Sequence, residues 1–223
     1  MAEAKASDAP QSLILIHRVI SRGLQVSLQH TETFARDGLP DPATGAGFAL
    51  YLSTLAGTLH IHHSAEDEIA FPFLRDRLPD LPFDVLTAEH LQMEAILDEM
   101  APILDRLQAG GLQGPALEAA HRLLAQLAKI WPGHIGLEES GISVPHLLTM
   151  ITGEELGRWL QAMGQHRPEG APPDPLVLPF ILHNLSPEDR ALMAQQMPPV
   201  VSQELVPVAW KEQWAPMKPF LLP

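Results

Sequence analysis

The chain has 223 residues, 46% of them hydrophobic, and a formal net charge of −13. This length suits one good-sized domain, or a domain of about 150 residues with an appendage. The 14 Lys and Arg stand against 27 Asp and Glu without a basic cluster, which excludes nucleic acid as a partner. The absence of cysteine excludes disulfides, thiol nucleophiles, iron–sulfur clusters and cysteine-bound zinc.

We expect no membrane association. Residues 1–10 mix acidic and small residues, unlike a signal peptide. The apolar run Leu13–Ile16 ends at His17 and Arg18 and is too short to cross a bilayer. The expected location is therefore the cytoplasm.

The sequence predicts an all-α fold. Aromatic residues make up only 5% of the chain, and Leu, Ala, Ile and Met supply most of the apolar volume, which favours helices over sheets. Gly- and Pro-rich turns divide the chain into long segments. We predict four long helices over residues 10–36, 46–75, 83–108 and 115 to beyond 134. The first would be capped by Ser7 or Asp8, and Gly110-Gly111 would end the third.

Beyond the four helices, Thr152 and Glu155 form a capping-box pattern that predicts an additional helix. From about Gly164 the composition changes, because 12 of the 22 prolines follow this point. We therefore expect a bundle domain over residues 1–163 and a Pro-rich extension over 164–223, made of short helices. Its runs Leu176–Leu185 and Val200–Trp214 are too apolar for a solvated tail, so they need the bundle or a second subunit of a homodimer as partner.

Three His–Glu pairs mark the candidate site. In each pair four positions separate the two residues, which places both side chains on one helix face. The pairs are His62–Glu66, His90–Glu94 and His134–Glu138.

The pairs have matching positions relative to the predicted turns. The midpoint between the first two pairs is residue 78, in the turn Leu78–Pro82, and the midpoint between the last two is Gly114. The midpoint between His17 and the first pair falls in the loop 37–47. In an up-down bundle, His17 and the three His–Glu pairs therefore lie in one layer. The alternatives are a solvated helix face or isolated core histidines.

A buried layer of histidines and carboxylates is costly unless it is paired, since each buried carboxylate loses its hydration. A metal ion removes that cost. Imidazole and carboxylate ligands on facing helices suit iron or manganese.

These segments resemble the hemerythrin-like HHE cation-binding family. The resemblance covers about residues 10–163 and rests on Leu15–Arg18, His62–Pro72, Ala88–His90 and His134–Glu139. It implies an antiparallel up-down four-helix bundle that holds two iron ions joined by an oxo or hydroxo bridge, with manganese or zinc as substitutes. By the same resemblance, the terminal ligands are His17, His62, His90 and His134, and the bridging carboxylates are Glu66 and Glu138.

The sequence departs from the oxygen carriers of this family in helix 3. The carriers have a second histidine one turn after the first, whereas this chain has Glu94. We include Glu94 among the predicted ligands, and a carboxylate-rich site favours the ferric state.

Three further points concern the neighbours of the predicted ligands. Both Glu138 and Glu139 are eligible in helix 4. His63 lies about 100° around the helix from His62 and is expected at the surface or behind the ligands, although adjacent ligands occur in the family. Trp131-Pro132-Gly133 predicts a kink or bulge directly before His134.

Two functions follow from the resemblance. The first is a module that binds or senses dioxygen, nitric oxide or iron. The alternative is a di-iron oxidase, oxygenase or peroxidase that acts on a small substrate, which Glu94, the predicted kink and the long C-terminal region favour. The first is preferred, and the sequence assigns no catalytic residue.

Overall fold

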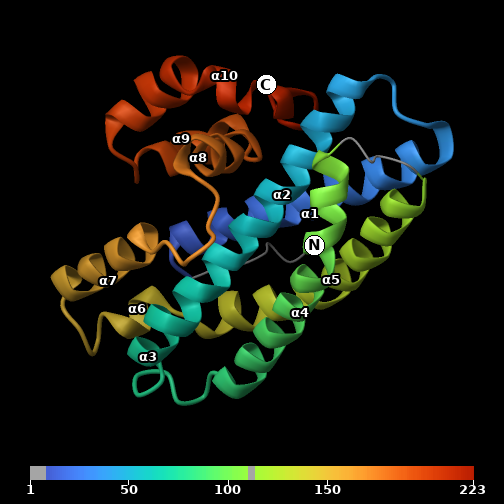
Figure 1. The fold of residues 1–223 in the computed structure, drawn as a ribbon. Helices are drawn as coiled ribbons and strands as arrows, with labels where there is room; N and C mark the ends of the chain where they lie inside the picture. Colours follow the sequence, from blue (N-terminus) through green and yellow to red (C-terminus); the bar gives the residue numbers. More distant parts are fainter. Residues whose placement is uncertain (1–8, 110–113) are drawn as a thin grey trace, which may run out of the picture.

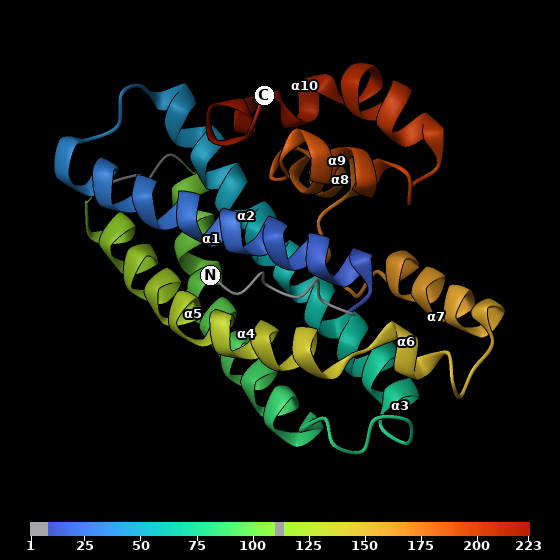
Figure 2. The ribbon, with the colours of Figure 1, turned by 180° about the vertical axis from the view of Figure 1, so that it is seen from behind.

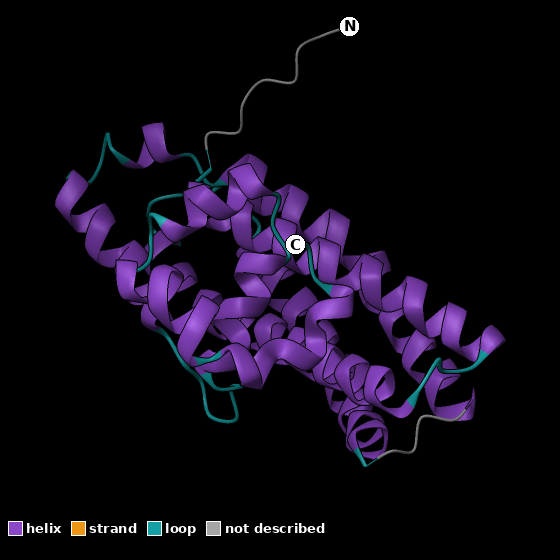
Figure 3. Cartoon of the chain, turned by 90° about the horizontal axis from the view of Figure 1, so that it is seen from above, coloured by secondary structure: helices purple, strands orange, loops and turns teal. Residues whose placement is uncertain are grey.

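The computed structural model describes residues 9–109 and 114–223, and within these ranges it contains helices and no strand. Four long helices form a bundle, and short helices complete the molecule (Figures 1 and 3). The long helices are α1 (Gln11–Asp37), α2 (Pro42–Ala65), α4 (Phe83–Gln108) and α5 (Gly114–Gly141). The all-helical prediction is confirmed. The predicted cap at Ser7 or Asp8 and the helix end at Gly110-Gly111 lie outside the described residues.

Helix α2 begins earlier than the predicted start at Ala46. Asp41 caps it by accepting a hydrogen bond from the backbone N–H of Thr44, and Pro42 occupies the first turn. Both features stabilise a helix start, because the first N–H groups of a helix have no partner within it.

A π-helical turn, η1 (Glu66–Ala70), follows α2 and leads into α3 (Phe71–Leu74). The helical path therefore continues through Pro72. This proline has no N–H to donate, which favours a departure from α-helical bonding in the preceding turn. This wider turn begins at Glu66, one of the predicted ligands.

Helix α5 is continuous through Pro132, so the structure contains no bulge there, and the alternative that the sequence offered, a kink, stays a prediction. Pro132 and Gly133 lie on the exposed side of α5. A carbonyl left without its helical partner can be hydrated at such a position. The irregular turn beside the site therefore belongs to the α2–α3 path.

Short helices close the end of the bundle near α3. They are α6 (Val144–Leu147) and α7 (Gly153–Gln165), and the predicted capping box between Thr152 and Glu155 is present. Leu147 and Trp159 pack with Phe71 and Leu74 in a second apolar core.

The C-terminal extension lies along α1 and α2 (Figures 1 and 2). Its elements are α8 (Asp174–His183), α9 (Pro187–Ala194), η2 (Val201–Ala209), α10 (Lys211–Trp214) and η3 (Ala215–Phe220). Phe180 and Phe220 belong to the same buried core as α1 and α2. The hydroxyl of Tyr51 donates to Asn184 Oδ1 at 2.7 Å. The domain boundary near residue 163 stays a sequence-based prediction.

The backbone of this extension approaches α2 closely. A Cβ on Gly47 would lie 2.1 Å from the carbonyl oxygen of Pro216, so only glycine permits the contact. Within the described residues, no helix is long and apolar enough to cross a membrane.

Candidate metal centre

Six of the seven predicted ligands converge in one buried layer of the bundle. Their side chains form two groups in which the donor atoms lie within 4.8 Å of one another. The first group is His17, His62, Glu66 and Glu138, and the second is Glu66, His90, His134 and Glu138. The two groups therefore share both carboxylates.

The sequence did not decide whether Glu138 or Glu139 is the ligand, and the structure gives the two side chains different positions. Glu138 is fully buried and belongs to the layer, with Oε2 3.2 Å from His17 Nε2. Glu139 is 31% exposed and lies behind His17, with Oε1 2.8 Å from Nδ1 of that ring.

His63 belongs to this layer, contrary to the expectation from its helix position. It is 1% exposed, and its ring stacks on that of His90 with the centroids 4.3 Å apart. His63, His90 and His134 form a third group of donors within 4.8 Å of one another. The sequence held a signal for this, since α2 has no charged residue and is apolar nearly all round, which is typical of a helix buried on several faces.

Glu94 is the predicted ligand that lies apart from these groups. Its carboxylate is 30% exposed, with Oε2 3.0 Å from His60 Nδ1 and Oε1 3.5 Å from His63 Nδ1. Glu94 thus lies behind His63, as Glu139 lies behind His17.

Two further ring nitrogens are held in the same way. Nδ1 of His90 lies 2.9 Å from Asp67, and Nδ1 of His134 lies 3.0 Å from Glu89. A carboxylate on Nδ1 favours the tautomer with the proton there and directs the lone pair of Nε2 inward. This arrangement is typical of metal-binding histidines.

Most of the donor atoms that face one another lack a hydrogen-bond partner. The Nε2 atoms of His17, His62 and His63 and all four oxygens of Glu66 and Glu138 are buried without a hydrogen bond among the described residues. Buried polar groups are otherwise almost always satisfied. A cation between these atoms would satisfy them together, so the residues present fit a metal centre.

Without a cation, the layer holds protons at neutral pH. Burial lowers the pKa of His17, but contacts with Glu138 and Glu139 outweigh burial and raise the pKa to about 9. Burial opposes charge on His90 too, and its two carboxylate neighbours raise its pKa to about 9. Burial and the nearby Glu138 raise the pKa of Glu66 to about 8.

The other histidines of the layer remain neutral. Burial lowers the pKa of His62 well below its ordinary value and the pKa of His63 to about 4. Burial is also the main reason that the pKa of His134 is lowered. Neutral imidazoles with inward lone pairs are ready to bind a cation.

Aromatic rings pack against the histidines of the buried layer. The centroid of Trp131 lies 5.5 Å from that of His17 and 5.8 Å from that of His62, and its indole N–H donates to Ser21 Oγ at 2.8 Å. Phe71 stacks on His90 at 5.3 Å with an interplanar angle of 9°. These contacts fix the planes of the histidine rings.

The fold and the site together define a cation-binding helical bundle. A family model described as the hemerythrin HHE cation-binding domain matches residues 11–143, more than half of the chain. The chain therefore belongs to the hemerythrin HHE cation-binding family. Comparison with curated proteins and with solved structures gave no match.

Proposed function

We propose that the protein binds two iron ions within the bundle and that this centre takes up dioxygen or nitric oxide, or senses iron. The observation that carries the proposal is the position of Glu66 and Glu138. Each is buried, has no hydrogen-bond partner among the described residues, and is shared by both groups of donors. Two carboxylates between two sets of histidines are what a pair of neighbouring cations requires.

The donor groups divide the histidines unequally. His17 and His62 would serve one ion, and His63, His90 and His134 would serve the other. The ion with fewer protein ligands would retain room for a small molecule, as open metal sites do.

This assignment bears on the choice between the two functions. The sequence suggested that Glu94 makes the site rich in carboxylate and favours the ferric state. In the proposed ligand set the imidazole of His63 replaces that carboxylate, which removes one argument for oxidation chemistry. The reversible binding of a small ligand is therefore preferred.

When bound, iron would supply the reversible redox chemistry by which such centres hold dioxygen or nitric oxide. The protein's part is to orient the histidine rings and to exclude bulk water. Glu139, Asp67 and Glu89 fix the tautomers of the ligand rings, while Trp131 and Phe71 keep bulk water from the buried layer.

Elemental analysis and an optical spectrum of the purified protein test the metal proposal. We expect about two equivalents of iron per chain, or of manganese or zinc when the expression host supplies these instead. Iron should also raise the unfolding temperature of metal-free protein, because a ligand that binds only the folded state stabilises it. A folded, metal-free protein whose unfolding temperature does not respond to iron would refute the proposal.

Exposure of the reduced protein to air separates the two functions. A spectral change that reverses when oxygen is removed supports binding or sensing. Rapid and irreversible oxidation supports the alternative, an oxidase, oxygenase or peroxidase. The observation that favours this alternative is a groove of about 390 Å³ on the surface beside His17.

A further inference from the structure

Glu94 holds its histidine less tightly than the other carboxylates behind the buried layer do. Nδ1 of His17, His90 and His134 lies 2.8 to 3.0 Å from a carboxylate oxygen. Oε1 of Glu94, in contrast, lies 3.5 Å from Nδ1 of His63. Neither ring nitrogen of His63 has a hydrogen-bond partner among the described residues. The His63 ring can therefore turn without breaking a hydrogen bond.

Glu94 also contacts a histidine outside the layer. His60 lies three positions before His63 on α2, and its Nδ1 is 3.0 Å from Glu94 Oε2. His60 is 37% exposed, Glu94 is 30% exposed and His63 is 1% exposed. His63 is in turn grouped with His90 and His134, with donor atoms within 4.8 Å of one another. Metal-binding atoms thus follow one another from the surface into the layer.

The charge of this face favours the approach of a cation. Helix α2 contains no Lys, Arg, Asp or Glu, and α4 places the exposed Asp98 one turn after Glu94. Arg106, the one Lys or Arg of α4, lies about three turns beyond Glu94. In the part of the chain that the structure describes, the ion pairs of Glu94 are those with the two histidines. Its negative charge is therefore not neutralised by a basic side chain of either helix.

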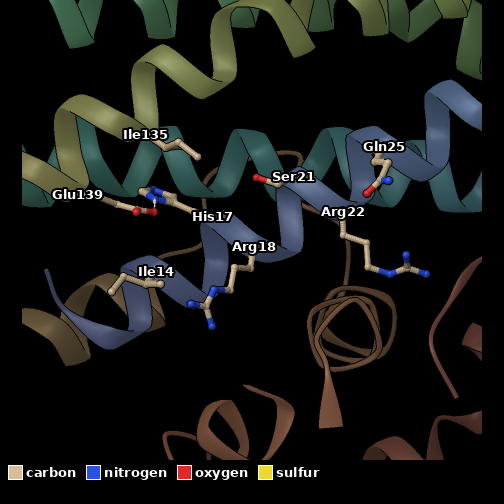
Figure 4. A pocket seen from close by; sticks show the side chains of 8 residues that line it. All are labelled: Ile14, His17, Arg18, Ser21, Arg22, Gln25, Ile135 and Glu139. Carbon is tan, nitrogen blue, oxygen red and sulfur yellow. Dashed lines mark hydrogen bonds and ion pairs between the residues drawn. The ribbon is translucent and has the colours of Figure 1, made fainter. Parts of the chain in front are cut away.

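The groove beside His17 is less suited to a cation. It reaches the outer side of the layer at His17 and Glu139, but Arg18 and Arg22 also line it (Figure 4). Arg18 pairs with Asp189. The two positive charges of the groove thus offset the two negative ones, which leaves no net charge to attract a metal ion.

We propose that His60 and Glu94 form the entrance through which ferrous iron reaches the buried layer. The two side chains take the cation from solvent, because imidazole and carboxylate are ligands that suit iron. The ring of His63 then passes it to the neighbouring histidines. This inference rests on the proposed metal centre. It assigns His60 to the rate of iron uptake and not to the amount of iron that is finally bound.

Anaerobic rapid mixing of metal-free, full-length protein with ferrous iron tests the proposal. A ferrous chelator stops the uptake at set times, and elemental analysis at equilibrium gives the final content. We expect His60→Ala to lower the initial rate about threefold or more, and His60→Lys to lower it about tenfold or more, because lysine repels the incoming ion. Both variants should reach about two equivalents of iron, since His60 is not a ligand of the centre.

Two controls separate the entrance from a general effect of histidine or of charge. His166→Ala removes a histidine that contacts Ser64 and Glu68 on the same helical path, and it should take up iron like the unchanged protein. Arg18→Gln removes a positive charge from the groove, which would speed uptake if iron entered there. We expect its rate to be unchanged. Added salt should narrow the difference between His60→Lys and the unchanged protein, because salt screens charges at the surface.

Equal initial rates in the unchanged protein, His60→Ala and His60→Lys would overturn the entrance alone, provided that all three bind iron. Faster uptake by Arg18→Gln would also overturn it, since iron would then enter by the groove. A lower final iron content in His60→Ala at an unchanged initial rate would show that His60 is a ligand and not an entrance. Unchanged protein that takes up no iron would refute the proposed function, and the entrance with it.

Discussion

The Nε2 atoms of His90 and His134 lie 3.1 Å apart, although 44 positions separate the residues in the chain. Nδ1 of each ring faces a carboxylate, Asp67 or Glu89, which favours a proton on Nδ1 and a lone pair on Nε2. Two lone pairs at this distance repel each other unless a proton or a cation lies between them. Two nitrogens that each lie about 2.1 Å from one metal ion would be separated by about 3 Å. The pair therefore has the spacing of two ligands to a single ion.

His63 and Glu94 give the first prediction. We expect His63→Ala to lower the iron content of the purified protein toward about one equivalent, because it removes one of the three imidazoles assigned to one ion. Glu94→Gln should retain about two equivalents, because this side chain lies behind His63 and can still accept a hydrogen bond. Elemental analysis of the two variants, purified in parallel, measures both. The reverse order of metal loss would show that Glu94 is the ligand.

The metal-free protein should lose stability as pH rises from 6.5 to 9. The folded-state pKa values of His17 and His90 are raised from 6.5 to about 9, so their contribution is present below 6.5 and is lost as pH rises toward 9. Glu66 acts in the same direction, because its folded-state pKa of about 8 exceeds its ordinary value of 4.5. The lowered pKa values of His62 and His63 matter only below 6.5.

Urea unfolding at pH 6.5 and pH 9 measures this effect. In iron-loaded protein the same groups are held without their protons, so the fall in the free energy of unfolding over this range should disappear. Iron uptake by metal-free protein near pH 7 should also release protons and strengthen as pH rises. An iron affinity that falls between pH 6.5 and pH 8 would contradict the proposed ligands.

The sequence predicted that these side chains share one layer, because this prediction needs only local features, namely spacing within a helix and the positions of turns. The four-residue spacing of His62 and Glu66 fixes a helix face, and the positions of the turns fix the level at which the faces meet. It could not rank His63 against Glu94, since that choice depends on which rings fill the space between α2 and α4. The π-helical turn at Glu66–Ala70 was also missed, because proline at 72 and proline at 132 have the same local chemistry and only the surroundings differ.

Glu138 and Glu139 provide a prediction about neighbouring residues with different roles. Glu138→Gln should abolish the binding of at least one ion, because it neutralises a carboxylate that both groups of donors share. Glu139→Gln should retain the metal but weaken its binding by about 10- to 100-fold, the usual effect of removing a carboxylate that orients a ligand histidine. Competition with a chelator of known iron affinity gives both values. Equal loss in the two variants would mean that Glu139 is itself a ligand.

The C-terminal extension gives the last prediction, which concerns stability without chemistry. Phe220 is 3% exposed and packs against the rings of Phe48 and Tyr51, far along α2 from His62. Phe220→Ala should therefore lower the free energy of unfolding by about 3 kcal/mol or more, because it opens a cavity in the core shared by the extension and the bundle. Val208→Ala is the matched control, since Val208 is 72% exposed in the same extension and its loss should cost less than about 0.5 kcal/mol.

Both variants should retain the metal content of the unchanged protein, because neither residue belongs to the donor groups. Denaturant unfolding and elemental analysis measure the two quantities. If Phe220→Ala unfolded like the control, the extension would contribute little to the core, and if it lost metal at unchanged stability, the extension would act on the centre directly.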